Sequence, residues 1–220
     1  MPAPDALVPA PLLKAASISG AAQEWHEVLL ENGRYRQDEF TLDRHGFSLM
    51  TLHATGGEAD LLRAETGASR VHIFARDRRA AAPARGAHGD ASAARVLQQL
   101  FPDEAAQLLA YRFAIVHLWR ASGPTPPRPL ALAEWDSIAG PDLIPAGPGR
   151  ASLDLRHDPR HRWVHFPHQQ PDELLLIKSY DSETDGRARC SFATPVDAEA
   201  PFGEAEELRA LLIWEPRLLN

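Results

Sequence analysis

Hydrophobic and polar positions alternate with a helical period in only two parts of this chain. Residues 57–68 carry a short helical pattern that ends at Gly67, a residue suited to a C-cap. Residues 92–112 carry a second pattern, with Ser92 as an N-cap and Pro102 as an interruption. Because proline cannot continue a helix, this segment predicts two short helices rather than one.

Elsewhere the pattern predicts strands. Residues 24–55 alternate in short runs, and Asn32-Gly33 between the first two runs predicts a two-residue hairpin. A short strand is expected at 71–74, followed by a loop over 75–91. Further strands are predicted at 113–119, 129–135, 151–155, 163–166, 174–177, 187–196 and 208–214.

Proline- and glycine-containing turns separate the strands that follow residue 112. Many short strands divided by turns are typical of a β-barrel or jelly roll. We therefore expect an α+β, mainly β fold, in which the helices flank a barrel. Residues 1–20 are rich in Ala and Pro and are expected to form a flexible arm, with residues 21–220 forming one domain.

Composition narrows the classes of protein to which the chain can belong. Hydrophobic residues make up 44% of it and five are Trp, which suffices for a sizeable core. The net charge of −7 argues against a nucleic-acid-binding protein. The single cysteine excludes a disulfide framework. Neither a signal peptide nor an apolar run of membrane-spanning length is present, so a cytoplasmic location without membrane contact is expected.

The string His88-Gly89-Asp90 is the first candidate for chemistry. On one strand, residues two apart point to the same face, so His88 and Asp90 would project together. With one distant histidine they would form the facial triad of non-haem iron enzymes, which leaves open positions on the metal. The string alone is a weak signal, because it is also common in turns.

A second candidate is the segment 157–168, which holds four histidines. His161 with His165, or His165 with His168, could form a ligand pair. The alternative is a solvated, Arg-rich turn that enters a strand. Tyr180-Asp181-Ser182 likewise forms either a polar site at a strand end or a turn. Neither a nucleophile elbow nor a phosphate-binding loop is present, so hydrolases and nucleotide-binding proteins lack their motifs here.

The order of several strings along the chain resembles the AsaB-like hydroxylase/desaturase family of non-haem iron oxygenases. The resemblance covers roughly residues 35–214, and its specific parts are the HRW string at 161–163 and the PDELLLIKSYDS string at 171–182. The remaining similar strings lie at 39–47, 66–74, 88–90, 113–120, 129–132 and 207–211.

The resemblance implies a double-stranded β-helix, the jelly-roll or cupin-like barrel, which holds Fe(II) and uses 2-oxoglutarate and O₂. It implies that His88 and Asp90 are the first two iron ligands. Two positions depart from the family pattern. Ala193 stands where the family has its distal histidine, and Gly203 stands where it has an arginine. Alanine cannot bind iron, and glycine cannot pair with a carboxylate.

Three explanations of this departure are open. The third iron ligand is another residue, for which His161, His165 and Cys190 are the candidates. Alternatively, a two-ligand site still turns over, with Arg189 or Arg209 holding the cosubstrate. In the third explanation, the barrel has lost catalysis and kept only binding.

The expected function is that of a non-haem Fe(II)/2-oxoglutarate oxidoreductase, a hydroxylase, desaturase or cyclase acting on a small natural-product intermediate. Polar residues on strands are well placed to orient a ligand at a barrel mouth, so Arg120, Lys178, Tyr180 and Asp181 are the expected catalytic residues. For Arg120 the alternative is a salt-bridged residue at a sheet edge.

The rival function is that of a metal-free member of the same barrel. It would act as a small-molecule-binding protein, or as an isomerase or cyclase that uses His161, Tyr180 and Asp181 as acids and bases. In both cases the partner is a small molecule, and a homodimer is left open.

Overall fold

The computed structural model describes residues 13–19, 22–52, 56–79, 87–122, 130–147, 152–196 and 204–216. Gly203, residues 1–12 and 20 of the expected arm, and residues 80–86 of the expected loop lie outside the described residues. Residues 13–19, also assigned to that arm, form a strand that pairs with residues 22–28.

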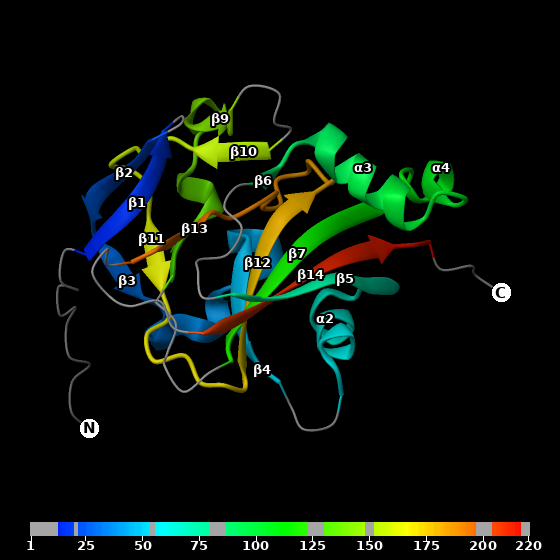
Figure 1. Cartoon of the computed structure of the whole chain (residues 1–220), viewed down its shortest axis with the longest axis horizontal. Coiled ribbons are helices and arrows are strands. Elements are labelled where there is room, and N and C mark those ends of the chain that lie inside the picture. Colours follow the sequence, from blue (N-terminus) through cyan, green and yellow to red (C-terminus); the bar gives the residue numbers. More distant parts are fainter. Residues whose placement is uncertain are drawn as a thin grey trace.

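The largest unit is an antiparallel sheet of five strands in the order β4-β12-β7-β14-β5 (Figure 1). Its strands are β4 (Phe47–Thr51), β5 (Arg70–Arg79), β7 (Arg112–Ala121), β12 (Glu173–Asp181) and β14 (Ala205–Trp214). Four of these five contain strands that the hydrophobic pattern predicts, although each is longer than predicted. In β12 and β14 most of the added residues are buried, whereas residues 75–78 of β5 are not.

Three smaller sheets lie on the other side of the molecule in Figure 1. One is the pair β1 (Leu13–Ser19) and β2 (Ala22–Val28). The second has the order β13-β8-β11-β3 and is formed by β3 (Leu30–Asn32), β8 (Leu130–Ala133), β11 (Trp163–His165) and β13 (Ala193–Pro195). The third has the order β6-β10-β9 and is formed by β6 (Ala87–His88), β9 (Leu143–Pro145) and β10 (Ser152–Leu155).

Helices cover both faces of the five-stranded sheet. Helix α2 (Glu58–Thr66) ends at Gly67 in the left-handed conformation, as predicted. Helices α3 (Asp90–Leu100) and α4 (Ala105–Leu108) are separate, as the proline between them predicts. The remaining helical segments are α1 (Leu42–His45) and the 3₁₀ turns η1 (Gly33–Glu39), η2 (Trp135–Ser137) and η3 (Gly140–Asp142).

Successive residues of β7 point to alternate faces of the five-stranded sheet, so their packing partners distinguish the two faces. Ala114, Val116 and Leu118 pack with residues of α2, and we call this the outer face. Phe113 and Ile115 pack with α3 and α4 on the opposite face, which we call the inner face. Residues paired across neighbouring strands share a face, so the register assigns the rest of the sheet.

The four-stranded sheet faces the inner face of the five-stranded sheet. Leu132 and Val164 share a buried cluster with Trp119 and Ile177 of the five-stranded sheet, and Ala193 packs against the same cluster. Two facing sheets flanked by helices agree with the predicted jelly-roll class. The interior between the sheets is where this class of barrel binds its ligands.

The hairpin prediction at Asn32-Gly33 is wrong. Asn32 instead caps η1, accepting a hydrogen bond from the Arg34 amide, and β3 pairs in parallel with β11. A Cβ at Gly33 would lie 2.7 Å from side-chain atoms of Val164 and Phe166. The glycine therefore serves close packing rather than a turn. The predicted strand at 187–196 is also too long, because only Ala193–Pro195 forms a strand.

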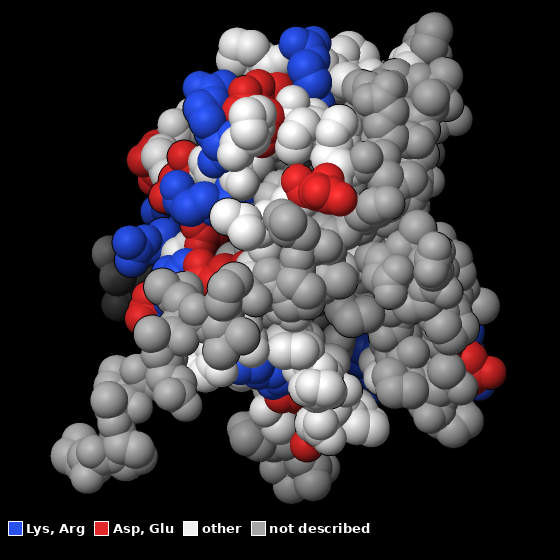
Figure 2. Space-filling view, turned by 90° about the vertical axis from the view of Figure 1, so that its left-hand side faces the viewer, with Lys and Arg blue, Asp and Glu red and all other residues white. Residues whose placement is uncertain are grey.

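The face of the molecule in Figure 2 shows Lys and Arg side chains interspersed with Asp and Glu among its described residues. This mixing accords with the many ion pairs of the structure, for example those of Arg34 with Glu173 and of Arg160 with Asp158. Within the described part of the chain, every helix is too short or too polar to cross a membrane.

Candidate functional site

A polar group interrupts the apolar inner face at its centre. His117 lies between Ile115 and Trp119 on that face of β7, and it pairs in register with Arg209 of β14. Glu207 lies two residues before Arg209 and therefore on the same face. His117 and Glu207 are buried, with exposed fractions of 5% and 1%. Polar groups so deeply buried need partners or a function.

His88 ends β6, and its ring Nδ1 lies 2.9 Å from Ser92 Oγ. Burial first, and then the neighbouring His117 and Arg209, lower the pKa of His88 to about 4. The imidazole is therefore neutral near pH 7, the state in which histidine binds metals.

Asp90 does not share a strand with His88, because it is the first residue of helix α3. The strand argument for their common direction is therefore wrong. Asp90 Oδ1 accepts hydrogen bonds from Tyr180 Oη (2.9 Å) and Arg189 Nη2 (2.7 Å). These two donors lower the pKa of Asp90, Arg189 having the larger effect. The carboxylate is ionised, and 78% of the side chain is exposed.

Asp90, Tyr180 and Arg189 thus form a second polar group on the inner face. Tyr180 follows a bulge in β12 and pairs with Ile115, which fixes it on that face. Burial and the neighbouring Asp90 raise the pKa of Tyr180 to about 12, so the phenol remains a donor. Arg189 also donates from Nε to the Asp181 carbonyl (3.0 Å), and its guanidinium lies 5.4 Å from the centre of the Tyr180 ring.

Arg209, expected to hold the cosubstrate, has an incomplete set of hydrogen bonds. Its Nη2 donates to Asp77 Oδ2 (3.1 Å). Its Nε is buried and has no hydrogen-bond acceptor among the described residues. A buried donor of this kind on the inner face could receive a carboxylate oxygen from a ligand. Arg189 has fewer donors to spare, because Asp90 and the Asp181 carbonyl already engage it.

His161 does not qualify as the third metal ligand in this arrangement. Its Nδ1 accepts from the Asp158 amide (3.3 Å), and its Nε2 lies 3.1 Å from Asp142 Oδ2. Both ring nitrogens are thus engaged in holding the loop that precedes β11. A histidine that binds a metal or acts as an acid or base needs a ring nitrogen that is free for that purpose. We therefore assign His161 a structural role.

His165 and Cys190 lie on the other side of the four-stranded sheet. Neighbouring residues of β11 alternate between faces, so His165 shares the face of Trp163, away from Val164 and the interior between the sheets. Cys190 is buried in the same apolar cluster as Trp163, and burial raises the pKa of its thiol to about 12. A thiol in that state is a poor metal ligand.

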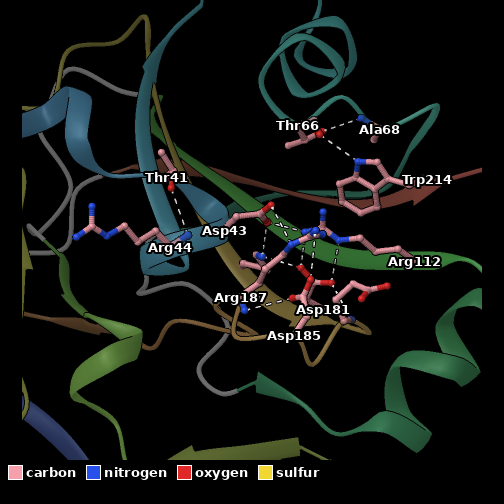
Figure 3. Close-up of polar contacts among 12 residues, drawn as sticks. Thr41, Asp43, Arg44, Thr66, Ala68, Arg112, Asp181, Asp185, Arg187 and Trp214 are labelled. Carbon is pink, nitrogen blue, oxygen red and sulfur yellow. Dashed lines mark hydrogen bonds and ion pairs between the residues drawn. The ribbon is translucent and has the colours of Figure 1, made fainter.

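Lys178 and Asp181, expected as catalytic residues, belong to an ion-pair network on the outer face. They pair in register with Val116 and Ala114, which carry the outer cluster. Figure 3 shows this network, in which Arg112 donates hydrogen bonds to both Asp43 and Asp181. Lys178 Nζ donates to Asp181 Oδ2 (2.7 Å) and Asp43 Oδ1 (3.1 Å). Their expected place in the pocket is therefore not supported.

Arg120 also lies on the outer face. It pairs in register with Glu206 and donates to the Glu206 carboxylate, and Glu58 of α2 lies 3.6 Å away. The alternative of a salt-bridged arginine fits this placement, and a pocket residue does not.

A metal fits the inner face in part. Among the residues that the structure describes, no three His, Cys, Asp or Glu side chains converge as a ready metal site. His88, Asp90 and His117 carry donor atoms of the right chemistry; of these, His117 lies on the inner face and Asp90 is hydrogen-bonded to Tyr180 of that face. The Nε2 of His117 is buried without a hydrogen-bond partner in the described parts of the chain. An orphaned imidazole nitrogen of this kind is what a metal would occupy.

Sequence reasoning missed His117 and Glu207. The signal available was a histidine in the middle of an apolar strand, in phase with Phe113, Ile115 and Trp119. In contrast, nothing in the sequence could pair it with Glu207, which lies 90 residues away.

Comparisons with known proteins agree with the family resemblance that the sequence shows. A sequence family described as an oxidoreductase/YMDC permease-like domain matches residues 8–213. The hydroxylase/desaturase efuI of Hormonema carpetanum is 30% identical over 248 residues, covering 86% of this chain and 83% of the relative. The hydroxylase/desaturase asaB of Aspergillus flavus is 28% identical over 220 residues, covering 87% and 82%.

A solved structure shares the fold. A variant of the iron and alpha-ketoglutarate-dependent endoperoxidase NvfI matches with a TM-score of 0.74 and 25% identity, covering 89% of each chain. This likeness confirms the jelly-roll class, and the sequence matches confirm the resemblance seen in the strings. The chain belongs to this oxidoreductase family, together with the hydroxylase/desaturases of the AsaB-like group.

Proposed function

We propose that this protein is a non-haem Fe(II)/2-oxoglutarate-dependent oxidoreductase that acts on a small natural-product intermediate. The observation that carries the proposal is the buried imidazole of His117 beside an arginine, Arg209, with an unused donor on the inner face. The Asp90 carboxylate is held by Tyr180 of the same face. A cytoplasmic location and a small-molecule partner are parts of the same proposal.

The names of relatives support it. One relative from Aspergillus novofumigatus, 28% identical over 230 residues, is an Fe(II)/2-oxoglutarate-dependent dioxygenase called nvfI. Another, from Talaromyces stipitatus, is the alpha-ketoglutarate-dependent dioxygenase tstK. The names of the hydroxylase/desaturases efuI and asaB point to hydroxylation or desaturation as the reaction class.

His88 and Asp90 would hold the iron, which supplies oxygen activation when bound. Tyr180 and Arg189 fix the direction of the Asp90 carboxylate and keep it ionised through their hydrogen bonds. Arg209 would donate its buried Nε to a carboxylate of 2-oxoglutarate, forming a charge-assisted hydrogen bond in a region shielded from water. Trp119 and Ile177 supply the apolar wall against which a hydrocarbon substrate would pack.

Anaerobic titration of the full chain with Fe(II), followed by 2-oxoglutarate, tests the proposal. We expect saturable Fe(II) binding and then a visible charge-transfer band when 2-oxoglutarate joins the metal. On admission of O₂, succinate should form slowly even without substrate. Arg209→Met should weaken the binding of 2-oxoglutarate and leave that of Fe(II) unchanged. A protein that binds no Fe(II) and releases no succinate would overturn the proposal.

A metal-free reaction on the same barrel is the second candidate. It is favoured by the lack of three converging donors among the described residues and by the buried His117–Glu207 pair, which has the form of a general base with its orienting carboxylate. The residues named for this alternative in the sequence, His161 and Asp181, do not face the interior. Turnover of a substrate that persists with a strong chelator would select this candidate.

A further inference from the structure

The segment with four histidines contains one, His157, that the candidate functional site does not use. His157 lies in the loop between β10 and β11, and its ring stacks on the ring of His26 in β2. The ring centres lie 4.0 Å apart, and the two planes are inclined by only 9°. The Nδ1 of His157 is buried and has no hydrogen-bond partner among the described residues. Strand β2 therefore contacts this loop through two imidazoles in parallel contact.

The surroundings of His157 disfavour a proton on its ring. Burial first, and then the neighbouring His26 and His161, lower the pKa of His157 below its usual 6.5. Asp158 acts in the opposite direction, and its effect is the smallest of the four. The stacked geometry and the burial thus point the same way, because both favour a neutral imidazole in this position.

The acidic residues on the neighbouring elements are occupied or exposed. They are Glu27 on β2, Asp142 on η3, Asp154 on β10 and Asp158 in the loop. Asp158 pairs with Arg160, and Asp142 lies 3.1 Å from the Nε2 of His161. Glu27 is exposed to solvent, and Asp154 has a partner of its own. A second proton on the stacked pair would therefore meet little compensation.

The hairpin of β1 and β2 packs on strands that support the candidate functional site. Strand β1 contacts β10 and β13 (Figure 1). Strand β10 pairs with β6, which ends at His88, and β13 begins at Ala193, which packs against the interior cluster. Val28, at the end of β2, is buried in one apolar cluster with Leu155 of β10. Release of the hairpin would therefore expose apolar surface and remove a support of these strands.

We propose that the stacked pair of His26 and His157 is a pH-sensitive latch, which keeps the β1-β2 hairpin docked at neutral pH and releases it in acid. In the docked hairpin the two rings cannot both carry a proton, because two positive charges would lie in contact away from bulk water. In the released hairpin each ring is hydrated and free to bind a proton. Because the released state binds more protons, docking is strongest above about pH 6.5 and weakens as the pH falls through that value. This inference does not depend on the proposed function.

Hydrogen exchange of the full chain at pH 7.5 and 5.5, followed by mass spectrometry and corrected for intrinsic exchange rates, tests the latch. We expect residues 13–28 to lose protection several-fold at pH 5.5, up to about tenfold, because one extra proton changes the equilibrium by at most that factor per pH unit. Strand β7, at the centre of the large sheet, should keep its protection. His157→Phe retains a ring that can stack but cannot be protonated, so the protection of its hairpin should not depend on pH.

Two further variants complete the experiment. His72→Phe is the matched control, because His72 is an exposed histidine of β5 that contacts the ring of Phe101, and it should respond to pH as the wild type does. His26→Phe replaces the other ring of the latch and covers the case in which His157→Phe does not fold. Equal protection of the wild-type hairpin at the two pH values would overturn the inference. A loss that persists in a folded latch variant, or that β7 shares, would also overturn it, because the response would then arise from other groups.

Discussion

Loss of charge from the outer-face network should affect stability in a predictable order. The network consists of Asp43, Arg112, Lys178 and Asp181 (Figure 3). The side chains of Lys178 and Asp181 are 2% and 0% exposed, so their charges depend on one another rather than on water. The informative pair of variants is Lys178→Met, which keeps the length of the side chain, and Asp181→Asn, which keeps its shape.

The two variants leave different residues unpaired. After Lys178→Met, Asp181 still accepts from Arg112 Nη2 (2.7 Å) and Nε (3.2 Å). The cost should then be that of one lost partner to a charged group, about 1–3 kcal/mol. After Asp181→Asn, the one carboxylate left to the buried ammonium of Lys178 among the described residues is that of Asp43, which is half exposed and also pairs with Arg112. Breaking a buried pair in this way costs about 3–5 kcal/mol.

Urea unfolding followed by tryptophan fluorescence measures both costs, provided that the dependence on denaturant stays the same. Fe(II) binding, measured on the folded variants, should not change, because the network and the candidate site lie on opposite faces of the sheet. An equal or larger loss for Lys178→Met would refute the reasoning on unpaired charge. A folded Lys178→Met variant that no longer binds Fe(II) or 2-oxoglutarate would show that Lys178 belongs to the active site.

Three further variants test other parts of the structure. Ala193→His should tighten Fe(II) binding in an anaerobic titration by adding an imidazole donor to the interior, and a variant that binds no better would show that position 193 does not reach the metal. Gly46→Ala should lower the free energy of unfolding by about 1–3 kcal/mol or more, because φ is +85° and the new Cβ would lie 2.6 Å from a backbone oxygen. Gly67→Ala, with positive φ but open space, should cost less; equal losses in urea unfolding would contradict the role of the clash. Hydrogen bonds from Arg34 lower the pKa of Glu173 below its usual 4.5, so this pair stabilises the metal-free protein above about pH 4.5 and ceases to do so as the pH falls through the lowered value. The unfolding midpoint of Glu173→Gln should therefore be lower than that of the wild type at pH 7 and converge with it in acid, and a constant difference would count against the ion pair.

Much of the fold could be predicted because it depends on local information. The glycine that ends α2, the proline between α3 and α4, and the apolar runs of β7, β12 and β14 act within a few residues of themselves. The Asn-Gly pair at 32–33 is also a local signal, but the hairpin that it predicts is wrong. The turn preference of this dipeptide is smaller than the packing constraint from two side chains more than 130 residues away.

Some features of the candidate site could likewise be predicted from the sequence, and others could not. The sequence by itself determined the family. It also showed the string that contains His88 and Asp90, and that position 193 is an alanine instead of a histidine. Only the tertiary structure decided which face of the five-stranded sheet each polar residue occupies. A bulge between Lys178 and Tyr180 breaks the alternation of β12, so that Tyr180 reaches the inner face while Lys178 and Asp181 stay outside.

The pairing of His117 with Glu207 was likewise beyond the sequence. Each residue lies in a strand that reads as an ordinary buried segment, and 90 positions separate them along the chain. Register between β7 and β14 places the imidazole beside the carboxylate and leaves Nε2 without a partner. A hydrogen bond between distant strands depends on register, which arises from the packing of the whole sheet, so the chemistry at the centre of this barrel exists only once the chain has folded.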